Sequence, residues 1–248
     1  MSYDTIIYTK SDHIARITLN RPQVNNTLNQ QMAQEVEDAC HQLKQDEDIY
    51  AVIISGAGNK AFCHGSAPEQ LDTGYSICKA VVSIDRPVIA AINGEALGQG
   101  LELALSCDIR LASDKAEFGF PQVATGLIPS DGGTQLLPRI VGRGKALELI
   151  LTAETISAKE ALEIGLVHKI VALKDLALEV EAMAKTITSK APIALRYAKE
   201  AINKGLDLTM EQGLRLETDL YLLLHTTKDR TEGINAFLQK RPSQFKGR

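Results

Sequence analysis

Residues 91–112, AINGEALGQGLELALSCDIRLA, contain an apolar strand, a glycine-rich turn and an apolar helix in direct succession. Gly98 and Gly100 flank Gln99 in the turn, and Glu102 follows inside the apolar run. Glycine loses more conformational entropy on folding than any other residue, and an unpaired buried carboxylate is costly. A turn whose backbone is itself the functional group, around Gln99, explains why small residues stand there.

Two other stretches share this design. Residues 61–69, AFCHGSAPE, leave a strand through Gly65, and residues 126–138, GLIPSDGGTQLLP, begin a helix behind Asp131 and two glycines. The first N–H groups of such helices are free to point at negative charge. Two such turns aimed at one point would form an oxyanion hole, although a purely structural role is also open for each turn taken singly.

Working outward, apolar strands alternate with amphipathic helices. Residues 5–22 read as a strand hairpin, residues 28–43 as one helical stripe, and residues 51–55 and 87–92 as short buried strands. This alternation predicts a largely parallel sheet covered on its faces. Helical patterns dominate from Gly142 onward, and the leucine-rich stretch 211–225 fits either a core helix or a subunit interface.

Composition narrows the class of function. The 248 residues carry a formal net charge of -4, no Trp and only 4% aromatic residues, which argues against nucleic acid or an anionic membrane as the main partner. The four cysteines are widely spaced, which suits reduced cytosolic thiols better than disulfides or a zinc site. There is neither a secretory leader nor an apolar run of the ~20 residues that a membrane span needs. We therefore expect a cytoplasmic protein.

Several motifs in order resemble the crotonase superfamily, the family of enoyl-CoA hydratases and isomerases. The resemblance covers nearly the whole chain. It implies an α/β fold, a crotonase-like spiral of ββα units, with residues 1–190 forming the core that holds the active site. Residues 191–248 would form a C-terminal helical trimerisation region. The motifs are ITLNRPQVNNTLN (17–29), AFCHGSAPEQL (61–71), RPVIAAINGEALGQGLELALSCDIRLAS (86–113), FGFPQVATGLIPSDGGTQLLPRIVG (118–142), SAKEALEIGLVHKIV (157–171) and GINAFLQKRPSQFKG (233–247).

By position, the resemblance makes the backbone amides of Ser66 and Gln99 the two oxyanion donors, which hold the thioester carbonyl and stabilise its enolate. Glu102 matches the first of the two catalytic glutamates of the hydratases, but the second position is Gln122. Glutamine can orient a water, yet it cannot transfer a proton at neutral pH. The resemblance therefore leaves open whether this chain hydrates its substrate by the two-glutamate route.

Asp131 matches a position where family members that isomerise dienoyl-CoA carry aspartate, so the resemblance favours a proton shuttle. Its alternative is a cap on the helix that begins near Gly132. Glu102 likewise has a structural alternative, an ion pair with an arginine such as Arg139.

For coenzyme A, the resemblance implies contacts from Val24 and Asn25 in the loop after NRP, and from Phe237 and Lys240 in the tail of a neighbouring subunit. His64 is a further candidate for substrate contact. The family often has a lysine where this chain has Glu69.

The resemblance thus implies an enzyme of fatty acid metabolism that adds water to an acyl-CoA thioester or shifts its double bond. Coenzyme A would enter only as part of the substrate, with no other cofactor and no metal. A homotrimer or a dimer of trimers is implied. Alternatives are a hydrolase or decarboxylase of a cyclic or branched acyl-CoA, or a non-catalytic acyl-CoA-binding accessory subunit.

Overall fold

The computed structural model describes residues 3–66 and 76–248, whose strands form two sheets. The large sheet contains β1 (Ile6–Ser11), β2 (Ile14–Leu19), β3 (Ala51–Gly56), β5 (Val88–Ile92), β7 (Ile109–Ser113) and β10 (Lys169–Val171). The small sheet contains β4 (Ala61–Cys63), β6 (Glu95–Leu97), β8 (Glu117–Gly119) and β9 (Thr155–Ser157). Their spatial orders are β1-β2-β3-β5-β7-β10 and β4-β6-β8-β9. Apart from the β1–β2 hairpin and the β8–β9 pair, neighbouring strands are parallel.

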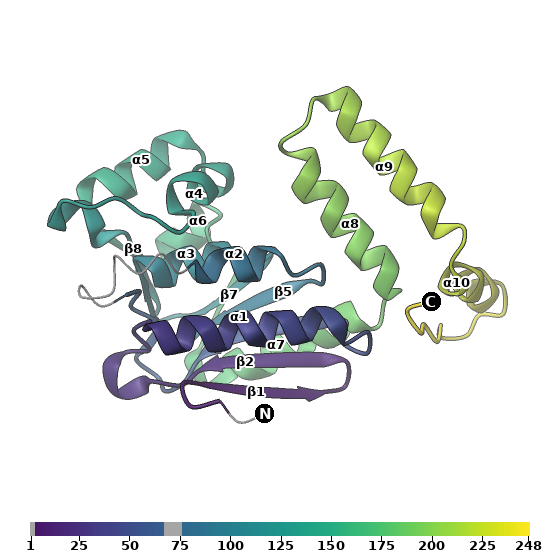
Figure 1. Cartoon of the computed structure of the whole chain (residues 1–248), viewed down its shortest axis with the longest axis horizontal. Helices are drawn as coiled ribbons and strands as arrows, with labels where there is room; N and C mark the ends of the chain where they lie inside the picture. The colour runs from purple at the N-terminus through teal and green to yellow at the C-terminus, as the bar shows by residue number, and fades with distance from the viewer. Residues whose placement is uncertain (1–2, 67–75) are drawn as a thin grey trace.

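Helices follow the strands in a regular order (Figure 1). The helices of the body are α1 (Gln30–Gln45), α2 (Ile77–Val82), α3 (Gln99–Leu105), α4 (Gly133–Val141), α5 (Arg143–Thr152), α6 (Ala158–Glu163) and α7 (Leu173–Thr188), with short 3-10 helices η1 (Pro22–Val24) and η3 (Pro121–Thr125). The sequences β3-β4-α2, β5-β6-α3 and β7-β8-η3-α4 repeat one unit. In each, the first strand joins the large sheet and the second joins the small sheet. The predicted spiral of ββα units is confirmed.

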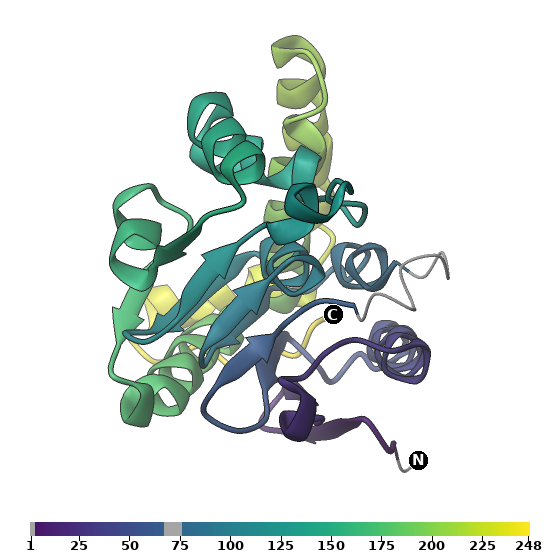
Figure 2. The ribbon, with the colours of Figure 1, turned by 90° about the vertical axis from the view of Figure 1, so that its left-hand side faces the viewer.

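The large sheet has an apolar layer on each face because its central strands are buried on both sides. On one face, Ile53 and Ile89 pack against α7 through Leu176 and Val180. On the other face, alternate residues of the same strands join the main core with α1, α2 and α3. Figure 2 shows α1 and α7 on opposite sides of the strands. The continuous apolar runs in the sequence correspond to this double burial.

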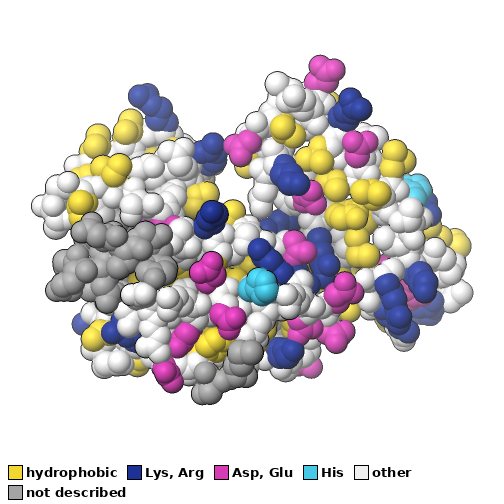
Figure 3. Space-filling model, in the orientation of Figure 1, with side chains coloured by type: hydrophobic (Ala, Val, Ile, Leu, Met, Phe, Trp, Pro, Cys, Tyr) yellow, Lys and Arg dark blue, Asp and Glu magenta, His cyan; other side chains and the backbone are white. Residues whose placement is uncertain are grey.

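The last three helices, α8 (Pro192–Gly205), α9 (Met210–Leu224) and α10 (Lys228–Leu238), extend away from the sheets (Figure 1). In α9 Leu220 is the one buried residue, whereas Leu214, Tyr221 and Leu222 are more than half exposed. The alternative of an intradomain core helix for this stretch is therefore wrong. Hydrophobic side chains gather on the surface over these helices (Figure 3). In the described ranges, no helix combines the length and apolar character that crossing a bilayer demands.

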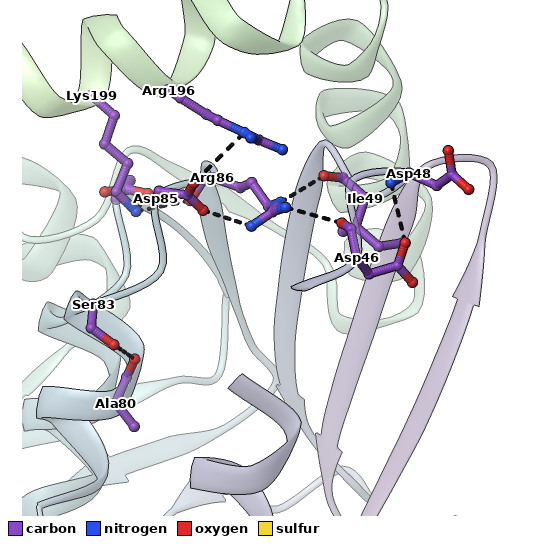
Figure 4. Close-up of polar contacts among 10 residues, drawn as sticks. Asp46, Asp48, Ile49, Ala80, Ser83, Asp85, Arg86, Arg196 and Lys199 are labelled. Atoms are coloured by element: carbon purple, nitrogen blue, oxygen red, sulfur yellow. Dashed lines mark hydrogen bonds and ion pairs between the residues drawn. The ribbon is translucent and has the colours of Figure 1, made fainter. Parts of the chain in front are cut away.

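A group of charged side chains attaches α8 to the body (Figure 4). Lys199 donates to the Arg86 carbonyl oxygen at 2.9 Å and to Asp108 Oδ2 at 2.7 Å. The fully buried Arg86 side chain donates to main-chain oxygens that precede β3 and to Asp85, which Arg196 also faces. Buried charges are tolerated where hydrogen bonds satisfy them, and these contacts fix the base of the helical region on the segments that precede β3, β5 and β7.

Candidate active site

The turn at 98–100 needs each of its glycines for a separate reason. Gly98 has φ +55° and ψ −126°, a conformation that side chains disfavour, and it precedes the first turn of α3. A Cβ atom at Gly100 would collide with the carbonyl oxygen of Cys63 in β4. Gln99 has no positive φ and is the first residue of α3. Its amide N–H has no acceptor among the described residues, as expected at a helix start.

Ser66 and Gln99 lie next to each other although 33 positions separate them. Gly65 (φ +75°) packs so tightly on the start of α3 that a Cβ atom there would lie 2.8 Å from the Gln99 nitrogen. The Ser66 hydroxyl donates to Gln99 Oε1. The structure thus brings together the two residues whose amides the family resemblance assigns to an oxyanion hole.

Glu102 is fully buried one turn into α3. Its Oε1 accepts hydrogen bonds from the backbone amides of Asp131, at 2.8 Å, and Gly133, at 2.7 Å. Its Oε2 is buried without a partner in the described chain. Burial raises the pKa of Glu102 to about 7, and the Asp131 charge acts in the same direction, while the backbone amides oppose it. Glu102 can therefore change protonation state near neutral pH.

Arg139 is not the partner of Glu102. Its side chain is half exposed and pairs with Asp207 on the surface. The structural alternative of a Glu102–Arg139 ion pair is wrong.

Asp131 is buried, but its side chain contacts the start of α2 and not the start of α4. One oxygen accepts from the Ser76 hydroxyl, and Oδ2 accepts from the Cys78 amide at 3.2 Å, both at the start of α2. Gly132 is the N-cap of α4, with no side-chain cap. The alternative that Asp131 caps α4 is therefore wrong, because the carboxylate binds the N-terminus of α2. Its predicted part in proton transfer stays a prediction.

Gln122 lies in η3, half-buried against the same turn. Its Nε2 lies 3.2 Å from the point where a Cβ atom on Gly98 would stand. Its Oε1 is buried, and no donor reaches it from the residues that the structure describes. Glu102 and Gln122 thus each hold one buried oxygen with spare acceptor capacity, both beside the N-terminal turn of α3.

The residues assigned to coenzyme A form two separate groups. Val24 ends η1 and Asn25 follows in a left-handed conformation. The His64 amide donates to the Asn25 carbonyl oxygen at 3.3 Å. Phe237, in the last turn of α10, and Lys240, just after that helix, are exposed, and α10 lies at the opposite side of the molecule from η1 (Figure 1). One chain therefore does not join its own tail to this loop. Glu69 lies outside the described residues.

The structure adds two residues that the sequence analysis did not select. Glu95, at the start of β6, contacts His64 Nε2 through its carboxylate, and Ser76 is the N-cap of α2 that contacts Asp131. The N-cap pattern of Ser76 was readable from the sequence. The Glu95 contact was not, because it depends on the parallel pairing of β4 with β6.

Comparisons with known proteins agree on one family. A sequence model described as enoyl-CoA hydratase/isomerase matches residues 9–248. The chain is 44% identical to YngF of Bacillus subtilis, which is named after that class, with 98% of this chain and 99% of YngF covered. It is 40% identical to the crotonyl-CoA hydratase of Syntrophomonas wolfei, with 99% of each chain covered. The crystal structure of an enoyl-CoA hydratase from Bacillus anthracis superposes with a TM-score of 0.95 at 38% identity, over 99% of this chain and 100% of that one.

Proposed function

Because the chain belongs to the enoyl-CoA hydratase/isomerase family, within the crotonase superfamily of enzymes, we propose that it adds water to an enoyl-CoA thioester. Glu102 is the residue that transfers the proton, and Gln122 orients the water. The backbone amides of Ser66 and Gln99 hold the thioester oxygen.

The pair of buried acceptor atoms, Glu102 Oε2 and Gln122 Oε1, carries this proposal. Buried polar atoms without a partner are rare and call for a donor. A water molecule has two O–H groups, so it can donate one to each of these oxygens. Its lone pairs then face away from both acceptors, toward the carbon to be attacked. Gln122 needs only its acceptor oxygen for this task, so the absence of a second carboxylate does not prevent it.

The proton balance also closes with one carboxylate. Ionised Glu102 takes a proton from the water as the water oxygen bonds to Cβ of the enoyl group. The electron pair of the double bond moves onto the thioester oxygen, where the two amides stabilise the enolate. Glu102 then returns the same proton to Cα, and the sum of the steps is the addition of H and OH. A pKa of about 7 suits a group that must both accept and release a proton near neutral pH.

The test uses a panel of straight-chain, branched and cyclic enoyl-CoA thioesters, with product mass as the readout. The proposal is supported if the unmutated protein adds one water to at least one of these thioesters. The same reaction should then be abolished in Glu102→Gln and at least tenfold slower in Gln122→Ala. If the reaction in D2O instead places deuterium on the acyl chain without adding water, and Asp131→Asn loses this labelling, the protein would be an isomerase that uses Asp131. Release of free coenzyme A or of carbon dioxide would assign a hydrolase or a decarboxylase.

We further propose that the protein is a trimer, alone or paired into a dimer of trimers, in which coenzyme A bridges two subunits. Val24, Asn25 and His64 of one copy would contact it together with Phe237 and Lys240 of a second copy. The apolar surface of α8–α10 supports this, because exposed patches of this kind mark interaction sites. It includes Ile202 at 65%, Leu206 at 69%, Met210 at 78% and Phe237 at 83% exposure.

Light scattering after gel filtration tests the assembly. A trimer or hexamer is expected. A monomer that binds acyl-CoA as tightly as the assembled protein does would exclude the bridging role. We also propose a cytoplasmic location, which the four free, buried cysteines support.

A further inference from the structure

The two residues that provide the oxyanion amides in the proposed function also have side chains that bind each other. We propose that Ser66 and Gln99 are positioning residues: their side-chain hydrogen bond ties the loop after β4 to α3 and fixes the separation of the two amide donors. This inference rests on the proposed role of those amides.

Among residues 64–66, the described part of this loop, the close backbone contact with α3 is at Gly65, one residue before Ser66. Cys63 pairs with Ala96 in the small sheet, and Gly65 packs on the Gln99 nitrogen. The Gly65 carbonyl oxygen accepts from Leu28, at 2.7 Å, and Ser66 itself bridges to Leu28. Within the described chain, the link from Ser66 to α3 is therefore the hydroxyl–amide bond. It holds the loop at the residue whose N–H is one of the donors.

The backbone gives no reason for a long polar side chain at position 99. Gln99 has no positive φ, and the conformational demand of the turn falls on Gly98. The pair is half-buried, which limits competition from water. Gln99 also adds no charge, whereas a carboxylate at this place would oppose the negative charge that develops on the thioester oxygen. A hydroxyl and a neutral amide can thus fix the spacing without weakening the electrostatics.

Loss of the Ser66–Gln99 hydrogen bond should slow the formation of the enolate. Donors that are well placed for the enolate oxygen stabilise it more than they stabilise the ground-state carbonyl. Loosening their separation therefore lowers kcat while KM changes little. Side chains that merely line the binding pocket would change KM instead.

The experiment is a double-mutant cycle of Ser66→Ala, Gln99→Ala and the double variant, with Ser66→Thr as the conservative variant that keeps the hydroxyl. Two reactions are measured: hydration, and exchange of the α-protons of butyryl-CoA in D2O followed by NMR. Exchange needs the enolate and Glu102 but no water addition, so it still reports on the amides if the protein turns out not to be a hydratase. Thermal melting checks that each variant is folded.

Each single alanine variant is expected to lower kcat and the exchange rate about threefold to tenfold, the range that one neutral hydrogen bond supplies. KM should stay within about twofold of the parent value, and the double variant should be no slower than the singles, because both remove the same bond. Ser66→Thr should keep more than about half of the parent rate, since it retains the donor. Effects below twofold, effects that multiply in the double variant, or a change confined to KM would overturn the inference.

Discussion

Replacement of Glu102 by glutamine should stabilise the fold while it abolishes catalysis, and the stabilisation should depend on pH in a defined way. The pKa of Glu102 is raised from 4.5 to about 7, chiefly by burial. An acid whose pKa is raised in the folded state stabilises the fold fully below its unfolded pKa and loses that contribution as pH rises through the folded pKa. Stability therefore falls between about pH 4.5 and pH 7 and levels off above.

The size of this effect follows from the two pKa values. Each pKa unit corresponds to about 1.4 kcal/mol, so the interval from 4.5 to about 7 corresponds to roughly 3 kcal/mol in the free energy of unfolding. The glutamine of the variant does not titrate, yet its amide oxygen can accept from the same backbone amides of Asp131 and Gly133. For a chain of this size, roughly 3 kcal/mol corresponds to a difference of about 6–12 °C in Tm.

The assay is thermal and urea unfolding of parent and Glu102→Gln at matched protein concentration, from pH 5 to pH 9. Because all other titrating groups are common to both proteins, the difference in Tm isolates Glu102. It should be small at pH 5, widen up to about pH 7 and stay constant above. A difference that is flat across this range, or a variant less stable than the parent at pH 8, would refute the assignment of a raised pKa to a buried, partly unsatisfied carboxylate.

Three further predictions concern the surroundings of the site and the base of the helical region. Asp131→Asn removes a negative charge that raises the pKa of Glu102, so the rise of kcat/KM with pH should move to lower pH, as measured by pH–rate profiles. Gly98→Ala forces a side chain into φ +55°, and it should cost about 1–3 kcal/mol in urea unfolding and reduce kcat through the displaced Gln99 amide. Lys199→Met removes two hydrogen bonds between α8 and the body, and it should lower the free energy of unfolding by about 1–3 kcal/mol in urea unfolding. Its matched control, Lys204→Met on the same helix, breaks only an exposed pair and should cost less than about 0.5 kcal/mol.

Backbone features of the site were predictable from the sequence. The turns at Gly65 and Gly98 and the first turn of α3 are set by local sequence. The glycine pattern and the apolar helix that follows it specify a turn whose amides are free. The parallel sheet was predictable for the same reason, since β3 and β5 are continuous apolar runs. These inferences rest on residues that are close in the chain, and a single sequence shows such local relations directly.

Side-chain partners were harder to predict, because they come from other repeats of the spiral. Asp131 is an acceptable helix cap in sequence, and it does bind a helix N-terminus, but that helix is α2, which begins 54 positions earlier, at Ile77. The leucine-rich stretch of α9 was ambiguous because amphipathic patterning does not state what covers the apolar face. In the structure that face is exposed.

The same topology explains how the site can hold glutamine at position 99. Each ββα unit sends one strand to the small sheet, so the ends of β4, β6 and β8 meet at one edge, where the loop and helix starts converge. The amide functions proposed for Ser66 and Gln99 belong to the main chain, so a change of side chain there alters how the two donors are placed but does not remove them. Glu102 is different, because the proton transfer proposed for it needs the carboxyl group itself, which accepts hydrogen bonds from the backbone amides of Asp131 and Gly133. Substitution should therefore slow the reaction only about threefold to tenfold in Gln99→Ala, where the backbone acts, and should abolish it in Glu102→Gln, which makes the contrast between these two variants the sharpest measure of how the site divides its work between main chain and side chain.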